Sequence, residues 1–153
     1  EREYNLDQAG TWWIYHEAPL YERGAVRKNA KVRDKAIVCG EAVVSVDSEV
    51  YDECAISGRA LITENAKVFG KAFVHGMSTV KGKAQVMGNA TVTEEATIQG
   101  EAQVYGFAYI AGLATIKDLA KAYDFVHIEG DVVIGGRDVW KGHAKISYFI
   151  IHN

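Results

Sequence analysis

The sequence predicts an all-β fold, a parallel β-helix or β-solenoid of about eight triangular coils with 18 residues each. Three observations predict it. A hydrophobic slot recurs every six residues from Ile14 to His152, and 21 of its 24 positions are Ile, Leu or Val. A small residue, mostly Ala, stands two residues before each slot, and 12 of the 15 glycines stand two residues after one. An α-helix, which repeats every 3.6 residues, does not have this period.

Each six-residue phrase is expected to form a short strand followed by a bend. Alternate residues of a strand point to the same side, so the small and the aliphatic residue face a narrow core and the residue between them faces solvent. Glycine tolerates the positive φ of a tight bend, and Asp or Glu replaces it at several positions. Stacked in parallel at about 4.8 Å per coil, the phrases predict a prism roughly 40 Å long.

The first residues of the chain lie outside the repeat. Residues 1–11 are predicted to form an N-terminal lid, and residues 12–153 the hexapeptide-repeat domain. The lid would cover the unpaired strand edges of the first coil, which otherwise promote aggregation. The only proline, Pro19, falls in an outward position of the first coil, where an edge strand tolerates a missing N–H.

The repeat runs from Glu22 to Ile116 without an insertion or a deletion. Beyond Ile116 it becomes less regular. The inward positions that depart from the pattern are Ala122, Val126, Val132, Asp138 and Trp140. Because no loop interrupts the regular coils, the sequence offers no segment from which a deep pocket could be built.

Composition and charge narrow the range of partners. The net charge is −3 and the isoelectric point is about 6.0, so neither a nucleic acid nor a membrane partner is expected. No apolar run is long enough to span a membrane. The two cysteines do not make a disulfide framework, because Cys54 falls in an inward small position and Cys39 in an outward one, as a free thiol. These features favour a cytoplasmic location.

Residues 18 apart are expected to stack in neighbouring coils, which sorts the outward side chains into three faces. Face one holds residues 49–51 and their equivalents 18 residues away. Its aromatic and basic candidates for a ligand site are Tyr51, Phe69, Tyr105, Tyr123, Lys67 and Lys121. The rings could stack on a sugar or on bases while the lysines supply charge. Stacked rings also stabilise a solenoid through contacts between coils, and that interpretation stays open.

Face two holds residues 73–75 and their equivalents, and it carries the best catalytic candidate. His75 faces outward beside Phe73, where a trimer partner could bury it and tune its pKa for a general base. The alternative is a surface histidine at a turn. His127 lies three coils away, roughly 14 Å by strand spacing, so the two cannot act on one atom within a subunit. The histidines are scattered, and no metal site is predicted from them: His16, His75, His127, His143 and His152.

The phrase Gly-x-Ala-x-Val, seen best between Lys81 and Val104, resembles the hexapeptide-repeat superfamily of trimeric, LpxA-like left-handed β-helices over nearly the whole chain. The opening NLDQAGTWWIYHEA, with phrases such as GNATV and NAKVFGKA, is similar to the YdcK-like transferases, a bacterial and prophage-associated branch. The resemblance implies left-handed coils and acyl transfer from acyl-CoA or an acyl carrier protein. It also implies a trimer whose active sites lie between subunits and depend on a histidine.

The unbroken repeat favours a non-catalytic structural or binding module that presents flat faces for oligomerisation or ligand binding. The resemblance to the prophage-associated branch implies that a phage or prophage encodes it. Such a protein would be virion-associated if phage encoded. A homo-oligomer is expected, either a trimer or an end-to-end assembly, with a protein or glycan partner and no cofactor. One alternative is an acyl-CoA-dependent acyltransferase with His75 as base. Another is a glycan-binding module that uses face one.

Overall fold

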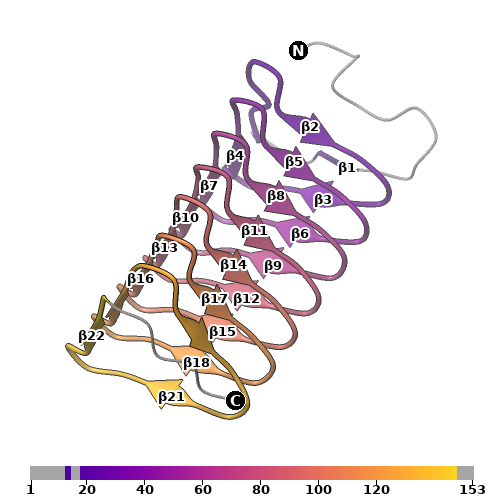
Figure 1. Ribbon diagram of the computed structural model, residues 1–153. Helices are drawn as coiled ribbons and strands as arrows, with labels where there is room; N and C mark the ends of the chain where they lie inside the picture. Colours follow the sequence, from indigo (N-terminus) through magenta and orange to yellow (C-terminus); the bar gives the residue numbers. More distant parts are fainter. Residues whose placement is uncertain (1–12, 15–17, 148–153) are drawn as a thin grey trace.

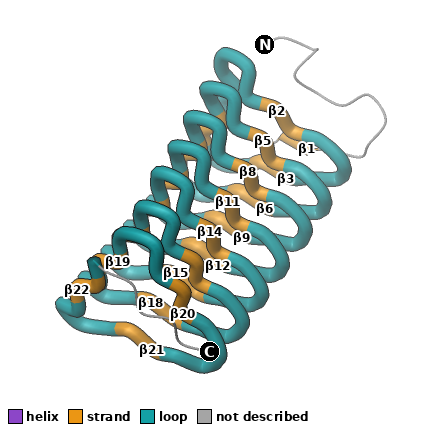
Figure 2. The backbone as a smooth tube through the Cα atoms, viewed as in Figure 1, coloured by secondary structure: helices purple, strands orange, loops and turns teal. Residues whose placement is uncertain are grey.

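The described part of the chain, residues 13–14 and 18–147 of the computed structural model, winds into stacked triangular coils (Figure 1). The predicted lid at residues 1–11 lies outside the described residues, as does the segment 148–153. Short strands alternate with bends along the described path, which contains no helix (Figure 2). These residues therefore include no helix that could cross a membrane.

Each face of the prism is one parallel sheet built from two-residue strands. Face one is formed by β1 (Trp13–Ile14), β3 (Lys31–Val32), β6 (Glu49–Val50), β9 (Lys67–Val68), β12 (Gln85–Val86), β15 (Gln103–Val104), β18 (Lys121–Ala122) and β21 (Val139–Trp140). Face two is formed by β4 (Ile37–Val38), β7 (Ala55–Ile56), β10 (Phe73–Val74), β13 (Thr91–Val92), β16 (Tyr109–Ile110), β19 (His127–Ile128) and β22 (Lys145–Ile146). Face three is formed by β2 (Ala25–Val26), β5 (Val43–Val44), β8 (Leu61–Ile62), β11 (Thr79–Val80), β14 (Thr97–Ile98), β17 (Thr115–Ile116) and β20 (Val133–Ile134).

The pairing register is 18 residues throughout, so Lys31 lies beside Glu49 and Glu49 beside Lys67. The 22 described strands, three to a turn, make about seven turns where the hexads predicted about eight. The difference lies at the two ends. The Leu20 phrase, which follows Pro19, pairs with Val38 through a single bridge, and the last phrase falls outside the described residues.

The core is the narrow interior of the prism, filled by the small and aliphatic residues of every coil. Val50 and Ile98 have no exposed surface, and the alanines of the small positions from Ala30 to Ala120 are at most 1% exposed. The less regular coil near the C-terminus is also closed, because Ala122, Val126 and Val132 are all buried. In this coil, two valines stand where other coils have alanine, and one alanine stands where they have valine or isoleucine. The larger and smaller side chains compensate and keep the interior filled.

The bends have the predicted backbone. From residue 22 to residue 142, the position two residues after every aliphatic slot has positive φ, and glycine occupies 12 of these positions. The N–H of the next small residue closes the bend, as Ala36 does by donating to the Arg33 carbonyl at 3.3 Å. At Gly58 a Cβ atom would lie 2.8 Å from backbone atoms of Gly76, so the close contact between coils also requires glycine there.

Acidic residues at the bends cap the coil that follows. Asp52 Oδ2 accepts a hydrogen bond from the Gly70 N–H at 3.0 Å, and Glu94 Oε2 accepts one from Gly112 at 2.7 Å. Asp118 and Asp124 cap the glycines one coil further in the same way. A carboxylate at a bend therefore satisfies a backbone donor that a glycine in its place would leave without a side-chain partner.

Polar residues in the small inward position also find partners within the coil. Ser48 Oγ donates to the Ser45 carbonyl at 2.7 Å, and Ser78 Oγ donates to the His75 carbonyl at 2.7 Å. Cys54 Sγ lies 3.2 Å from the Tyr51 carbonyl. Among the described residues no buried side-chain nitrogen or oxygen lacks a partner, so the narrow core tolerates small polar groups.

Candidate functional site

His75 lies at the outer surface of face two, immediately after β10. Its ring stacks on Phe73 with centroids 4.3 Å apart, and its Nδ1 lies 3.1 Å from Thr93 Oγ1 in the next coil. Burial lowers the pKa of His75 from its usual 6.5, while the Glu94 carboxylate acts in the opposite direction. The imidazole is therefore neutral at pH 7, and Nε2 is the nitrogen that remains for proton transfer.

The other described histidines do not join His75. His127 packs at a tilt against Tyr109, with centroids 4.8 Å apart, and its Nε2 lies 3.0 Å from Glu129 Oε2. His143 stacks on Phe125 with centroids 5.0 Å apart. His16 and His152 lie outside the described residues. Within the part of the chain that the structure describes, no three metal-ligating side chains gather.

The aromatic side chains of face one form a ladder along the prism. Tyr51 and Phe69 stack with centroids 4.8 Å apart, and Tyr105 and Tyr123 stack 4.6 Å apart, with only 4° between the ring planes in each pair. Arg33 covers Tyr51, with its guanidinium carbon 4.0 Å from the ring centroid. The rings therefore make contacts between coils, as in the alternative to a ligand site that the sequence left open.

This stacking limits which parts of the aromatic ladder a ligand could contact. Each ring of a pair covers one face of its neighbour, and 4.6–4.8 Å between centroids leaves no room for a sugar or a base between them. The ring edges and the tyrosine hydroxyls remain available on the outer surface. Burial raises the pKa of Tyr51 and of Tyr105, so both hydroxyls stay protonated at neutral pH and can donate hydrogen bonds.

A second aromatic stack, which the sequence analysis missed, follows the edge between faces one and two. Phe107 and Phe125 stack with centroids 5.1 Å apart and 3° between their planes, and His143 continues the stack. Phe107 is 56% exposed and Phe125 is 54% exposed. These residues stand three positions after the aliphatic slot, so sorting the edge positions by the 18-residue period would have found them.

The N-terminal part of the same edge carries charges in place of rings. An open groove of about 380 Å³, the N-terminal groove, lies there and is lined by Asp34, Lys35, Asp52, Glu53, Gly70 and Lys71. Glu53 pairs with Lys35 at 3.9 Å and with Lys71 at 3.7 Å. Asp34 pairs with Arg33 at 2.9 Å. The charged groups of this groove are therefore bonded to one another or to the backbone.

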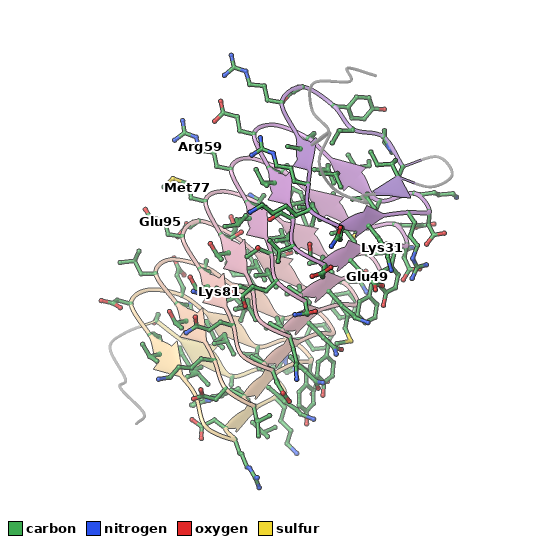
Figure 3. The ribbon with its side chains drawn as sticks, turned by 90° about the vertical axis from the view of Figure 1, so that its right-hand side faces the viewer. Lys31, Glu49, Arg59, Met77, Lys81 and Glu95 are labelled. Atoms are coloured by element: carbon green, nitrogen blue, oxygen red, sulfur yellow. The ribbon has the colours of Figure 1, made fainter. Side chains whose placement is uncertain are left out.

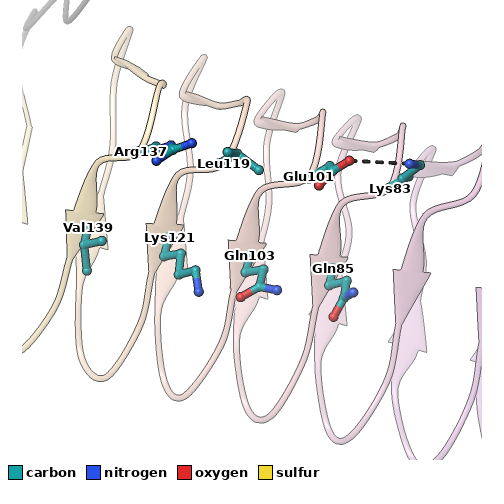
Figure 4. A pocket seen from close by; sticks show the side chains of 8 residues that line it. All are labelled: Lys83, Gln85, Glu101, Gln103, Leu119, Lys121, Arg137 and Val139. Atoms are coloured by element: carbon teal, nitrogen blue, oxygen red, sulfur yellow. Dashed lines mark hydrogen bonds and ion pairs between the residues drawn. The ribbon is translucent and has the colours of Figure 1, made fainter.

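A larger open groove lies over the C-terminal half of face one and the edge between faces three and one. This C-terminal groove, of about 450 Å³, is lined by Lys83, Gln85, Glu101, Gln103, Leu119, Lys121, Arg137 and Val139. Figure 4 shows two parallel rows, one on the strands and one on the edge. Lys83 pairs with Glu101 at 3.4 Å. Among the described residues, the side chains of Lys121 and Arg137 have no hydrogen-bond or ion-pair partner.

The candidate ligand residues of face one are thus divided between two regions. Lys67, Tyr51 and Phe69 lie in the N-terminal half, whereas Tyr105, Tyr123 and Lys121 lie in the C-terminal half. Of the six candidates, Lys121 lines one of the two grooves described above. The N-terminal half also carries charged side chains that pair between coils. Lys31 and Glu49, labelled in Figure 3, form an ion pair at 4.0 Å.

The two cysteines are placed as predicted. Cys54 is buried, and burial raises the pKa of its thiol to about 12, so it remains a neutral packing residue. Cys39 is half-buried on face two and is a free thiol. Burial, assisted by Glu22, raises the pKa of Cys39 as well. Neither thiol is activated as a nucleophile, because only the thiolate is strongly reactive.

Comparison with known proteins assigns no function to these surfaces. Comparison of the chain with protein-family models, with curated proteins and with solved structures found no match. The function is therefore inferred from the side chains and the geometry of the coils.

Proposed function

We propose that this protein is a non-catalytic β-solenoid of the hexapeptide-repeat type that works as a rigid structural or binding module. The observation that carries the proposal is the constant 18-residue register, which no inserted loop interrupts between Ala25 and Ile146. Active sites are usually enclosed pockets in which water is excluded. Both grooves of this prism are open to solvent along their length and lie on its outer surface.

The flat faces suit self-association into a trimer or an end-to-end assembly. Apolar side chains stand exposed on faces two and three, among them Ile37, Phe73 and Leu61. Apolar surface on a flat sheet is a common feature of protein interfaces. Light scattering over a concentration series tests this part. A constant oligomer mass, or a mass that grows with concentration, supports self-association, whereas a monomer at every concentration contradicts it.

A second function, acyl transfer from acyl-CoA, is favoured by one specific observation. Burial favours the neutral form of His75, and in the tautomer whose Nδ1–H donates to Thr93 Oγ1, Nε2 can accept a proton from an acceptor hydroxyl or amine. The resemblance to hexapeptide-repeat transferases adds support. In a trimer, a partner chain could complete the site around this histidine, and acyl-CoA would be a substrate.

The two functions separate in one assay. Release of free CoA from acetyl-CoA in the presence of amine and hydroxyl acceptors is measured for the parent chain, His75→Ala and His127→Ala. The non-catalytic function expects no release above background from any of them. Release that His75→Ala abolishes and His127→Ala retains would overturn the non-catalytic proposal. Release that both variants retain would exclude His75 as the base.

A further inference from the structure

We propose that the C-terminal groove binds an acidic polysaccharide that lies along the axis of the prism. This inference rests on the proposed function of a binding module and names its site and its ligand. The groove crosses four coils from Lys83 to Arg137, a distance of roughly 14 Å at the usual spacing of paired strands. It has room for a segment of a few sugar residues.

The charge of the groove favours an anionic ligand. It contains three cations and one acid, and the acid Glu101 is already paired with Lys83 at 3.4 Å. Lys121 and Arg137 are exposed and make no ion pair with any described residue. Arginine binds a carboxylate or a sulfate through two parallel hydrogen bonds, and lysine adds a mobile point charge. Free cations therefore stand one coil apart on the strand row and the edge row.

The amides of the groove favour a sugar over a simple anion. Gln85 on β12 and Gln103 on β15 are register neighbours on the same row. Each amide offers both donors and an acceptor, which matches hydroxyl groups that also donate and accept. Because the two amides repeat at the coil spacing of about 4.8 Å, they can bond successive units of an extended chain.

Apolar side chains complete the surface. Leu119 is 42% exposed on the edge row, and Val139 is 53% exposed on the strand row. They lie beside the two unpaired cations, as the two rows of Figure 4 show. Sugar rings carry apolar C–H groups between their hydroxyls, so a groove that combines amide, cationic and aliphatic side chains suits a sugar chain.

The surroundings of the groove disfavour other polymers. A peptide that adds to a sheet needs free backbone donors, but the N–H groups of Gln85, Gln103 and Lys121 already donate to carbonyls of the next coil at 2.8–3.0 Å. Single-stranded nucleic acid binds mainly by stacking bases on exposed ring faces. The neighbouring Tyr105 and Tyr123 stack on each other instead, so their covered ring faces are not available to bases.

Isothermal titration calorimetry with a short oligogalacturonate tests the proposal, with maltooligosaccharide and poly-glutamate as comparison ligands. We expect binding of the acidic sugar alone. Arg137→Gln and Lys121→Gln should each weaken it about tenfold, the usual effect of losing one charge-assisted hydrogen bond. Gln103→Leu keeps the charge of the groove but removes an amide, and it should weaken sugar binding several-fold.

Lys35→Gln in the N-terminal groove is the matched control and should leave binding unchanged. Equal binding of poly-glutamate, or equal loss in Lys35→Gln, would overturn the assignment to a sugar site, because net charge alone would then explain the binding. Absence of binding to the acidic sugar would also overturn it. Failure of the wider proposal is seen separately, as release of CoA in the acetyl-CoA assay.

Discussion

The two grooves lie in different coils of one repeat and use their charges in opposite ways. In the N-terminal groove, Lys35, Glu53 and Lys71 alternate in sign along one file, so each charge has a partner in the next coil. In the C-terminal groove, Lys121 is preceded by Gln103 and followed by Val139. The charged side chains of the N-terminal groove are therefore paired with one another, whereas Lys121 and Arg137 of the C-terminal groove stay available to a ligand.

The difference shows that the coil geometry alone does not decide whether a face can bind. Every outward residue of a β-solenoid stands beside the residue 18 positions away, at a distance that allows an ion pair or a ring stack. The order of residue types along one file then determines whether they bond each other. Alternating charges pair with one another and leave few groups for a ligand. A cation between an amide and an aliphatic residue has no ion-pair partner and stays available.

The largest effect is expected from creating a cavity in the core of the coils that carry the C-terminal groove. Ile98 on β14 is fully buried, and Ile98→Ala should lower the free energy of unfolding by about 2–5 kcal/mol. Because each coil contacts only its neighbours, the N-terminal and C-terminal halves should then lose amide protection in separate steps. Denaturant unfolding and hydrogen exchange measure both. The control Ile37→Ala, at a position 36% exposed, should cost much less.

A smaller effect is expected in the less regular C-terminal coil. Ala122→Val should destabilise the protein by about 1–3 kcal/mol, because Val126 and Val132 already occupy space in the same interior. The double variant Ala122→Val with Val126→Ala returns two of the three altered positions to the pattern of the other coils and should recover most of the loss. Urea midpoints compare the three proteins, and a stabilising effect of the single variant would contradict the compensation.

The two halves of the edge between faces one and two should respond differently to salt. Phe125→Ala removes a ring that stacks on both Phe107 and His143, and it should cost about 0.5–1.5 kcal/mol at any salt concentration. Glu53→Gln breaks two exposed ion pairs, and it should cost less than about 1 kcal/mol, a loss that disappears in high salt. Unfolding curves with and without added NaCl measure both, and equal salt dependence would contradict this distinction.

The smallest effect concerns His75, in the coil between the grooves. Burial lowers its folded pKa from 6.5, so the unfolded chain takes up the proton first as the pH falls. The contribution of His75 to stability is therefore complete above pH 6.5 and decreases as the pH falls below it. His75→Gln should reduce the difference between unfolding midpoints at about pH 7.5 and about pH 5.5. An unchanged difference would exclude this role for His75.

The sequence period predicted most of the fold because it encodes the geometry directly. The aliphatic slots became the buried strand residues, and the glycine positions became the bends with positive φ. Cys54 and Cys39 also lie where their phases predicted, one buried and one partly exposed. The turn count came out slightly high, because the Leu20 phrase makes only one bridge.

The candidate surfaces were harder to predict from sequence. The hexad analysis sorted the residues on either side of the aliphatic slot, but Phe107, Phe125, Arg137 and Leu119 stand at the edges, one residue beyond the bend. Ring orientation was also hidden, since only side-chain rotamers decide whether Tyr105 and Tyr123 turn their faces to solvent or to each other. The ion pairs of Glu53 likewise depend on how two lysine side chains extend.

The constant register also determines how such a chain can change length in evolution. A duplication of 18 residues adds one coil and leaves every downstream residue on its own face, so ladders and grooves are extended. A duplication of six residues keeps the core pattern but rotates everything downstream by one face. The aromatic file that begins at Tyr51 would then continue on a different side of the prism from Tyr105. Selection for a binding surface would therefore admit whole-coil duplications and reject single hexads, although both preserve the fold.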